Sequence, residues 1–454
     1  MNGAVFAYGR RMRSVVLSAL LVAACSAGAD AGDDDAGDAT SPVITDEVDA
    51  DLPIVKEAAP DVAAAAPHLE AFFAVPKQDG TGDGALETKI VELINGTPKG
   101  ARIRMSMYGF TRIAVADALG NAYDRKVDVQ VVLDEEENLR AKAAARFIPD
   151  ATATENDDVL DEDVDAAATP VSDEATAVAK LSKYNDAVAE LYKRLPDNKI
   201  TMCTRGRGSC IGNGIDHNKI YMFSTTGSSH DVVVQSSANL TTHHLHNNLV
   251  ISRGDAELYA GYVHYFDALQ KRKENLDYYR SEQGDHTIAY HYPRASGDTI
   301  VSILDNVRCS NKTHHTVYVT MAFFTQSRHA IADRLAQLQA DGCDVRVNMR
   351  HAGTDVDQSI IDILRGKGRA AKYKTDIKTY PDTHGTNIHS KYLIVDAAYE
   401  NSKGEHPVRQ LVWTGSHNYT GGALRNNDES LLRVDDKGVF DAFVANWKAI
   451  RAQM

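Results

Sequence analysis

The chain has 454 residues, of which 43% are hydrophobic and 25% charged, with a formal net charge of -14. This composition excludes a wholly disordered or collagen-like chain, and the length allows two domains or one duplicated domain. The acidity is concentrated in two segments: residues 26–67 carry -10 and residues 134–176 carry -11, while residues 1–25 carry +3, which leaves +4 for the remainder. The predicted folded core is therefore mildly basic, and the net charge does not exclude an anionic substrate.

The N-terminus has the pattern of an export signal. Arg10, Arg11 and Arg13 precede an apolar run over residues 15–24, which is too short to span a membrane. The run ends in Leu-Val-Ala-Ala followed by Cys25, which resembles a bacterial lipoprotein box, in which that cysteine is lipidated and becomes the new N-terminus. Ordinary signal-peptide cleavage just before Cys25 is the alternative.

Two further expectations concern the segment that follows. By the same resemblance, Ser26 stands where an Asp would favour retention in the inner membrane, so we expect a lipid anchor in the outer membrane; the periplasm or secretion is the alternative. Residues 26–67 are rich in Asp, Ala, Gly and Thr and bury too little surface to fold, so we expect a disordered acidic tether after a signal peptide over residues 1–25.

The rest of the chain contains an internal repeat. Residues 103–111 and 317–325 both predict a buried strand that ends in an aromatic residue and a threonine, and the helical patterns of residues 113–119 and 331–335 follow them. Further strands are predicted over residues 127–132 and 343–347, and closing helices over residues 257–275 and 439–452. This alternation predicts an α/β fold with two halves, residues 68–280 and 281–454, and an acidic surface insertion at about residues 134–176.

Besides Cys25 the chain has four cysteines. An even number in an exported chain favours two disulfides, Cys203–Cys210 and Cys309–Cys343. Buried free thiols are the alternative. A zinc site is disfavoured because no C-x-x-C or H-x-x-x-H spacing accompanies these cysteines.

A short motif occurs once in each half. His217 and Lys219 form one H-x-K, His389 and Lys391 form the other, and each is followed by an S-x-N that ends in Asn239 or Asn418. Residues i and i+2 of a strand point to the same face, so a pseudo-twofold packing of the halves brings all these side chains into one pocket.

That set of side chains suits phosphodiester cleavage. The lysines neutralise the phosphoryl oxygens as charge develops, and the asparagine amides donate hydrogen bonds to the same oxygens. One histidine acts as the nucleophile, and the other protonates the leaving oxygen and then activates water or an alcohol. The chemistry requires no metal ion and no other cofactor.

The duplicated motif resembles that of the phospholipase D superfamily, H-x-K-x4-D followed by G-S/G-x-N. The second copy matches fully, with Asp396 and with Gly415-Ser416 before Asn418, whereas the first has Ser224 at the Asp position and Ser236-Ser237 in place of Gly-Ser. The resemblance covers roughly residues 68–454. It implies a fold of two α/β sandwich halves with one active site at their interface, a monomer, and a covalent phosphohistidine. Asp396, Ser416, Glu429 and Ser237 are the expected supporting residues.

The resemblance also implies an acidic residue after S-x-N that orients a histidine. Glu429 fits this role in the second half, and Asn248 is the expected counterpart in the first. An amide stabilises an imidazolium less than a carboxylate does, so the two histidines are expected to be inequivalent. In lipid-cleaving members the first-half histidine is usually the nucleophile, which assigns His217 to attack and His389 to acid–base work.

Other polar residues have weaker signals. Arg205 and Arg207 lie in a Gly-rich loop before His217 and are candidates for binding a second phosphate or an acidic head group; a solvated loop is the alternative. His243, His244 and His246 look like a metal cluster, but a solvated loop after S-x-N is favoured.

Three functions compete. A phospholipase D that hydrolyses or exchanges a phospholipid head group is favoured by the predicted lipid anchor. Aromatic residues near the motif could line an entrance, although aromatic residues on core strands more often belong to the core; they are Tyr108, Phe110, Phe323, Phe324, Trp413 and Tyr419. An exported metal-independent endonuclease of the same superfamily is the first alternative. Simple nucleases of the family are often short single-motif chains that dimerise, which favours a lipid substrate here. A membrane-anchored binding protein that has lost turnover is the second alternative.

Overall fold

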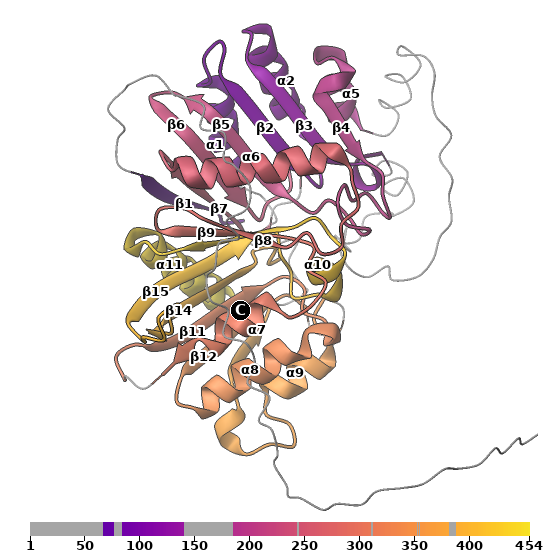
Figure 1. Cartoon of the computed structure of the whole chain (residues 1–454). Coiled ribbons are helices and arrows are strands. Elements are labelled where there is room, and N and C mark those ends of the chain that lie inside the picture. Colours follow the sequence, from indigo (N-terminus) through magenta and orange to yellow (C-terminus); the bar gives the residue numbers. More distant parts are fainter. Residues whose placement is uncertain are drawn as a thin grey trace, which may run out of the picture. The chain divides into compact units, whose positions relative to one another are not determined.

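The computed structural model describes residues 67–76, 84–139, 185–242, 245–309, 312–351, 353, 355–380 and 387–454. These residues form two mixed sheets with helices, so the predicted α/β architecture is confirmed (Figure 1). The predicted signal peptide, Cys25, nearly all of the tether, and most of the acidic insertion lie outside the described residues, as do His243 and His244. Within the described ranges, no helix is both long and apolar enough to cross a bilayer.

The first sheet has seven strands in the order β1-β7-β6-β5-β2-β3-β4. Strands β2, β3 and β4 run parallel to one another, and every other neighbouring pair is antiparallel. The strands are β1 (His68–Ala74), β2 (Arg102–Met107), β3 (Asp128–Asp134), β4 (Ile200–Cys203), β5 (Lys219–Thr226), β6 (Ser229–Ser236) and β7 (Asn247–Arg253).

The second sheet has nine strands and repeats this plan in the order β13-β12-β11-β14-β15-β16-β9-β8, with β10 paired to β14. Strands β11, β12 and β13 are parallel, and their neighbours are antiparallel, as in the first sheet. The strands are β8 (Arg280–Gln283), β9 (Thr287–His291), β10 (Val307–Arg308), β11 (His315–Met321), β12 (Asp344–Met349), β13 (Asp376–Thr379), β14 (Tyr392–Tyr399), β15 (Val408–Gly415) and β16 (Ser430–Val434).

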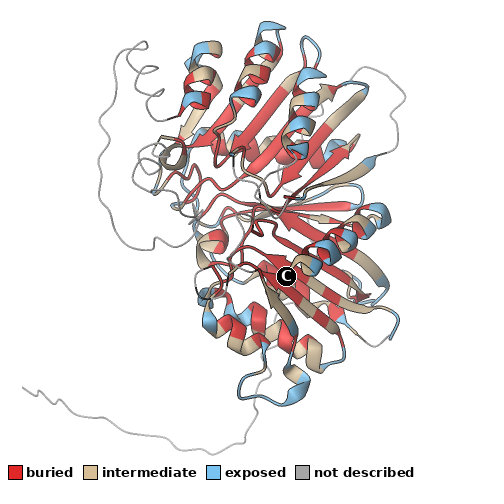
Figure 2. Ribbon diagram, turned by 180° about the vertical axis from the view of Figure 1, so that it is seen from behind, coloured by how far each residue is buried: buried red, intermediate tan, exposed pale blue. Residues whose placement is uncertain are grey.

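The helices cover both sheets and share one core between them. Helices α1, α2 and α5 pack on one face of the first sheet, α7, α8 and α9 pack on one face of the second, and α6 and α11 contribute to a third core with strands of both sheets. Figure 2 shows the buried residues gathered along the strands. The helices are α1 (Ala85–Asn95), α2 (Ile113–Asp124), α5 (Asp186–Arg194), α6 (Ala256–Lys271), α7 (Thr299–Asp305), α8 (His329–Ala340), α9 (Gln358–Leu364), α10 (Gly421–Arg425) and α11 (Lys437–Gln453).

The two closing helices begin in the same way. The side chain of Asp255 accepts from the N–H of Leu258 at the start of α6, and that of Asp436 accepts from the N–H of Val439 at the start of α11. Such an N-cap satisfies one of the unpaired N–H groups of the first turn and contributes about 1 kcal/mol. Each of these helices follows directly on the strand that comes after S-x-N, and both pack in the core between the sheets.

The structure joins the four cysteines in two disulfides, Cys203–Cys210 and Cys309–Cys343. Cys203 is the last residue of β4, so the first disulfide closes a loop that leads to His217. Cys343 directly precedes β12, and its disulfide joins that strand to the segment after β10.

Candidate functional site

The two H-x-K segments have matching geometry. His217 lies two residues before Lys219, the first residue of β5, and His389 lies three residues before Tyr392, the first residue of β14. Nζ of Lys219 donates to the carbonyl oxygen of His217, and Nζ of Lys391 donates to that of His389, both at 2.8 Å. All four side chains are buried, with at most 1% of their surface exposed.

Each H-x-K segment pairs with the opposite half of the chain. The N–H of His217 donates to the carbonyl of Asp428 at 3.0 Å, and the N–H of Asp428 donates to the carbonyl of Ile215 at 2.9 Å. In the same pattern, the N–H of His389 donates to the carbonyl of His246 at 3.0 Å. These two bridges bring the motifs of the two halves to one site.

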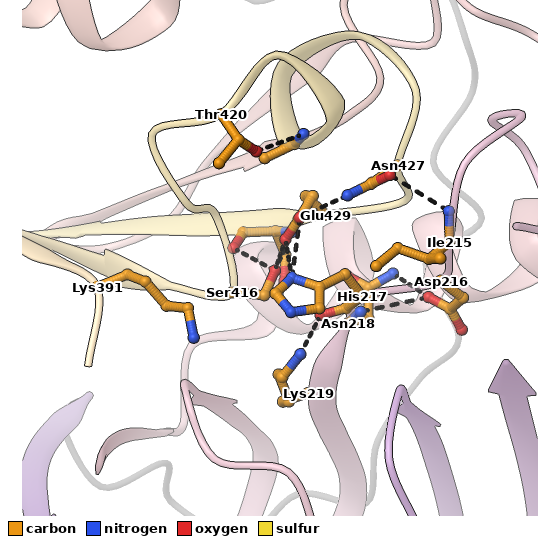
Figure 3. A network of polar contacts seen from close by, with 12 residues as sticks. Ile215, Asp216, His217, Asn218, Lys219, Lys391, Ser416, Thr420, Asn427 and Glu429 are labelled. Atoms are coloured by element: carbon orange, nitrogen blue, oxygen red, sulfur yellow. Dashed lines mark hydrogen bonds and ion pairs between the residues drawn. The ribbon is translucent and has the colours of Figure 1, made fainter. Parts of the chain in front are cut away.

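A carboxylate from the second half faces His217 (Figure 3). Nδ1 of His217 lies 2.9 and 3.0 Å from the two carboxylate oxygens of Glu429. Ser416 Oγ donates to Glu429 at 2.5 Å, and Asn427 Nδ2 donates to it at 3.3 Å. Burial alone would raise the pKa of Glu429, but the charge and hydrogen bond of His217, with His417 and Lys219, hold that pKa below its usual value. The site therefore keeps Glu429 ionised against the His217 ring.

An amide takes the corresponding place against His389. Nδ1 of His389 lies 2.9 Å from Oδ1 of Asn247, and Ser237 Oγ donates to the same oxygen at 3.0 Å. The expectation that Asn248 is the counterpart of Glu429 is therefore wrong by one residue.

The sheet register explains this correction. Ser236 pairs with Leu249 in the first sheet, as Gly415 pairs with Leu431 in the second, so Asn247 matches Glu429. Asn248 instead accepts from Thr414 Oγ1 at 2.7 Å and contacts the other half in that way.

The two S-x-N asparagines have polar atoms without protein partners. Asn418 is 1% exposed, and neither its amide nitrogen nor its amide oxygen finds a hydrogen-bond partner in the described part of the chain. The same holds for Oδ1 of Asn239. Burying an unpaired amide is costly, so these groups are suited to a bound substrate that supplies the missing partners.

The motif carboxylate Asp396 lies apart from the histidines. It sits in the middle of β14, where it accepts from His314 Nδ1 at 2.7 Å and from Gln410 at 3.3 Å. Ser224, at the matching position of the first half, accepts from the N–H of Arg102 at 2.8 Å. Both side chains therefore tie a motif strand to the start of its neighbour.

The aromatic residues divide into two groups. The Tyr108 ring lies against the His217 ring, with centroids 5.2 Å apart, and beneath Lys219 Nζ at 4.9 Å. Phe110, Phe324 and Trp413 are fully buried in the hydrophobic cores. The interpretation of these three as entrance residues is therefore wrong, because they fill the cores instead.

The weaker candidates have other surroundings. Arg205 donates to Glu274 at 2.9 Å and to the carbonyl of Arg272 at 2.8 Å, so it joins the loop to the end of α6. The substrate-binding role of Arg205 and Arg207 stays a prediction. His246 Nε2 lies 3.2 Å from both Tyr380 Oη and Gln453 Oε1, and burial lowers the pKa of His246 to about 4. In the described ranges, no three His, Cys, Asp or Glu side chains are grouped to hold a metal.

Comparisons with known proteins identify the family to which both halves of the chain belong. A family model described as "Cardiolipin synthase, PLD-like domain" matches residues 90–270 and 307–451. The phosphatidylserine synthase of Haemophilus influenzae Rd KW20 superposes with a TM-score of 0.51 at 14% identity, over 85% of this chain and 86% of that one.

Two further solved structures match more weakly. The polyphosphate kinase of Porphyromonas gingivalis has a TM-score of 0.49 at 11% identity, over 84% of this chain and 46% of that one. The phospholipase D family member Nuc of Salmonella typhimurium has a TM-score of 0.28 at 18% identity, over 37% of this chain and 94% of that one. No curated protein matches the chain by sequence. Since the family model covers both halves, the chain belongs to the PLD-like family within the phospholipase D superfamily, whose members generally act on phosphodiesters.

Proposed function

We propose that this protein is a phospholipase D-type phosphodiesterase that cleaves a phospholipid head group, by hydrolysis or transfer to an alcohol, through a covalent phosphohistidine. The observation that carries the proposal is the crossed pairing of His217 with Glu429 and of His389 with Asn247. Two buried lysines and the unpartnered amide of Asn418 accompany this pairing.

The crossed pairing supports a division of labour. The carboxylate of Glu429 holds the Nδ1–H of His217 and increases the basicity of its other ring nitrogen, which favours His217 as the nucleophile. Asn247 offers His389 only a neutral acceptor, so the imidazolium of His389 is less stabilised and loses its proton more readily. These properties suit His389 to the role of general acid.

The reaction then has two steps. Nε2 of His217 forms a bond to phosphorus while the bond from phosphorus to the leaving oxygen breaks, and His389 gives its proton to that oxygen. Water or an alcohol next loses a proton to His389 and attacks the phosphorus, which breaks the phosphorus–nitrogen bond and restores both histidines. Lys219, Lys391 and the two asparagine amides stabilise the charge on the phosphoryl oxygens in both steps.

A lipid substrate is supported by two likenesses. The family model is named after cardiolipin synthase, and the solved structure that aligns over most of both chains is a phosphatidylserine synthase. The predicted lipoprotein signal would bring the site to a membrane surface. The proposed enzyme is therefore a monomer anchored at the outer membrane, with both halves forming one site.

The test uses the full chain in EDTA. Purified protein is incubated with phosphatidylcholine or phosphatidylethanolamine vesicles and, separately, with single- and double-stranded DNA. We expect release of choline or ethanolamine, formation of a transfer product when ethanol is added, and no nicking. Nicking without head-group release would replace the lipid substrate by nucleic acid, and no cleavage in any reaction would favour a binding protein. Variants His217→Asn and His389→Asn must each abolish turnover if both halves form the site.

A further inference from the structure

The loop that precedes His217 is closed by a disulfide. We call residues 203–217 the clamp loop. Cys203 ends β4, Cys210 lies seven residues later, and both side chains are fully buried. The carbonyl of Gly214 accepts from the N–H groups of Arg207 and Ser209, and the N–H of Asp216 donates to the carbonyl of Gly208. The loop therefore holds its own fold through the disulfide and these internal hydrogen bonds.

The clamp loop binds the side chain of Asp428 from the other half. The carboxylate of Asp428 accepts from the N–H groups of Cys210 at 2.5 Å, Ile211 at 3.1 Å and Gly212 at 2.7 Å. Burial raises the pKa of Asp428 above its usual value, and the nearby carboxyl of Asp216 adds to this effect, whereas the three N–H groups act in the opposite direction. The loop thus supplies the hydrogen bonds that an ionised Asp428 needs in a buried place.

The clamp loop also binds the two residues before Asp428. The carbonyl of Asn426 accepts from the N–H groups of Asn213 and Gly214, both at 2.9 Å, and Oδ1 of Asn427 accepts from Ile215 at 3.2 Å. A Cβ atom on Gly212 would lie 1.9 Å from the Asn426 oxygen, and one on Gly214 would lie 2.2 Å from Asn427 Oδ1. The fit requires glycine at position 212, where the clash is with backbone, and at position 214 a larger residue would displace the Asn427 side chain.

The segment held in this way ends at the residue that orients His217. Residues 426–428 are fixed by the loop, and Glu429 follows them with its carboxylate at His217 Nδ1. The opposite bridge is built differently, because His246 stands in the place of Asp428 and contacts Tyr380 and Gln453. Residues 376–388, which precede His389, contain no cysteine. The segment that leads to His217 is therefore closed by a disulfide, whereas the sequence directly before His389 offers no cysteine for one.

We propose that Asp428 is a positioning residue, and that the clamp loop, closed by Cys203–Cys210, holds it so that Glu429 stays aligned on His217. The proposal rests on the proposed function and adds a redox requirement to it. A dithiol reductant transfers two electrons and two protons to the disulfide, becomes a disulfide itself, and leaves two thiols at Cys203 and Cys210. The clamp loop then loses its closure, and turnover falls without any change in the residues that contact substrate. An exported protein would meet the oxidising conditions that keep this bond formed.

The first experiment compares two matched variants of the full chain. The double variant Cys203→Ser, Cys210→Ser removes the clamp-loop disulfide, and Cys309→Ser, Cys343→Ser removes the one away from the site. We expect kcat to fall about 10- to 100-fold in the first variant, as for a misaligned catalytic group, and to change little in the second. KM should stay within about twofold in both, because neither disulfide contacts substrate. Equal kcat values in the two variants would overturn the proposal.

The second experiment does not depend on turnover. Hydrogen–deuterium exchange of the wild type is measured with and without dithiothreitol, and in the variant Asp428→Asn. We expect faster exchange over residues 210–217 and 426–429 in both cases, with strands β2 and β11 unchanged, and recovery after reoxidation. Unchanged exchange over these segments would reject the positioning role. If wild type cleaved no phosphodiester, the proposed function would fail, while this measurement would still decide whether the clamp loop holds Asp428.

Discussion

Nδ1 of His217 lies 2.9 Å from the carboxylate of Glu429, although the two residues are 212 positions apart in the chain. Neither half of the protein contains this pair by itself. Glu429 is kept ionised by His217, by nearby His417 and by Lys219, and it also accepts from Ser416. The pair therefore couples assembly of the two halves to the reactivity of the first histidine.

Replacing Glu429 by Gln should lower kcat far more than it raises KM. A neutral acceptor no longer stabilises charge on His217, and loss of the matching Asp in a serine-protease triad costs about 10⁴-fold, so we expect a loss of about 10²- to 10⁴-fold. The measurement is steady-state hydrolysis of phosphatidylcholine. Ser416→Ala removes one donor to Glu429 but keeps the carboxylate, and should cost less. A Glu429→Gln variant with wild-type kcat would contradict the role of the pair.

The Glu429→Gln variant should also change how the free energy of unfolding depends on pH. The pKa of Glu429 is lowered in the folded state, so its ionised carboxylate stabilises the folded protein. This stabilisation is fully present at pH values above the pKa of an unfolded Glu, about 4.3, and is lost as the pH falls through the pKa of the folded state. Wild type should therefore lose more unfolding free energy between about pH 5 and pH 3 than Glu429→Gln does. Urea denaturation at several pH values measures this difference. Parallel curves for the two proteins would show that Glu429 is not held ionised.

The asymmetry at His389 can be removed by one substitution. Asn247→Asp places a carboxylate at Nδ1 of His389, which should stabilise its protonated form and raise its pKa by about 1 or more. If His389 is the general acid, the alkaline limb of the pH profile of kcat should move upward by a similar amount. Asn248→Asp is the matched control, because Asn248 contacts Thr414 and not His389. Equal profiles for the two variants would mean that residue 247 does not tune the acid.

Patterns of short spacing in the sequence predicted much of the site. Contacts between residues far apart in the chain were not predicted. The two H-x-K and S-x-N motifs, the repeated strands and the closing helices depend on spacings of a few residues, and the structure has the strands and helices near the predicted positions. The partner of His389 depends on the length of the turn after S-x-N. Ten residues separate Ser237 from Asn247, whereas thirteen separate Ser416 from Glu429. Because the two spacings differ by three residues, the spacing in the second half does not locate the partner of His389 in the first half.

The disulfide that closes the clamp loop was predicted from the cysteines, but the crossed pairing and the contact of this loop with the second half had no local signal. Asp428 accepts a hydrogen bond from the N–H of Cys210, which lies 218 residues before it in the chain. The residues next to Asp428 in the sequence indicate only an acidic turn. The roles of Gly212 and Gly214 can be understood only from the structure. Gly212 leaves room for the backbone of Asn426, and Gly214 leaves room for the side chain of Asn427. The partner of Asp396 was not predicted either. It is His314, which lies directly before β11 and 82 residues before Asp396 in the chain.

Asp396→Asn should affect stability more than turnover. Its carboxylate accepts hydrogen bonds from His314 and Gln410 within the second sheet, away from His217 and His389, the proposed catalytic histidines. We expect a loss of about 0.5–1.5 kcal/mol of unfolding free energy, typical of one hydrogen bond, with kcat within about twofold of wild type. Denaturant titration and phosphatidylcholine hydrolysis on the same preparation give both values. A large fall in kcat at unchanged stability would place Asp396 in the catalytic machinery.

The order of the two histidines can be read from a trapped intermediate. A diester with a nitrophenol leaving group needs little acid assistance in the first step, because nitrophenolate leaves without a proton. The variant His389→Asn should then release about one equivalent of nitrophenol in a burst and keep the phosphoryl group on His217, since the base for the second step is missing. Mass spectrometry of peptides prepared at alkaline pH locates the adduct. The variant His217→Asn should give neither burst nor adduct. An adduct on His389 in the His217→Asn protein would reverse the assignment, and it would assign the nucleophile to the histidine paired with Asn247 and the acid to the one paired with Glu429.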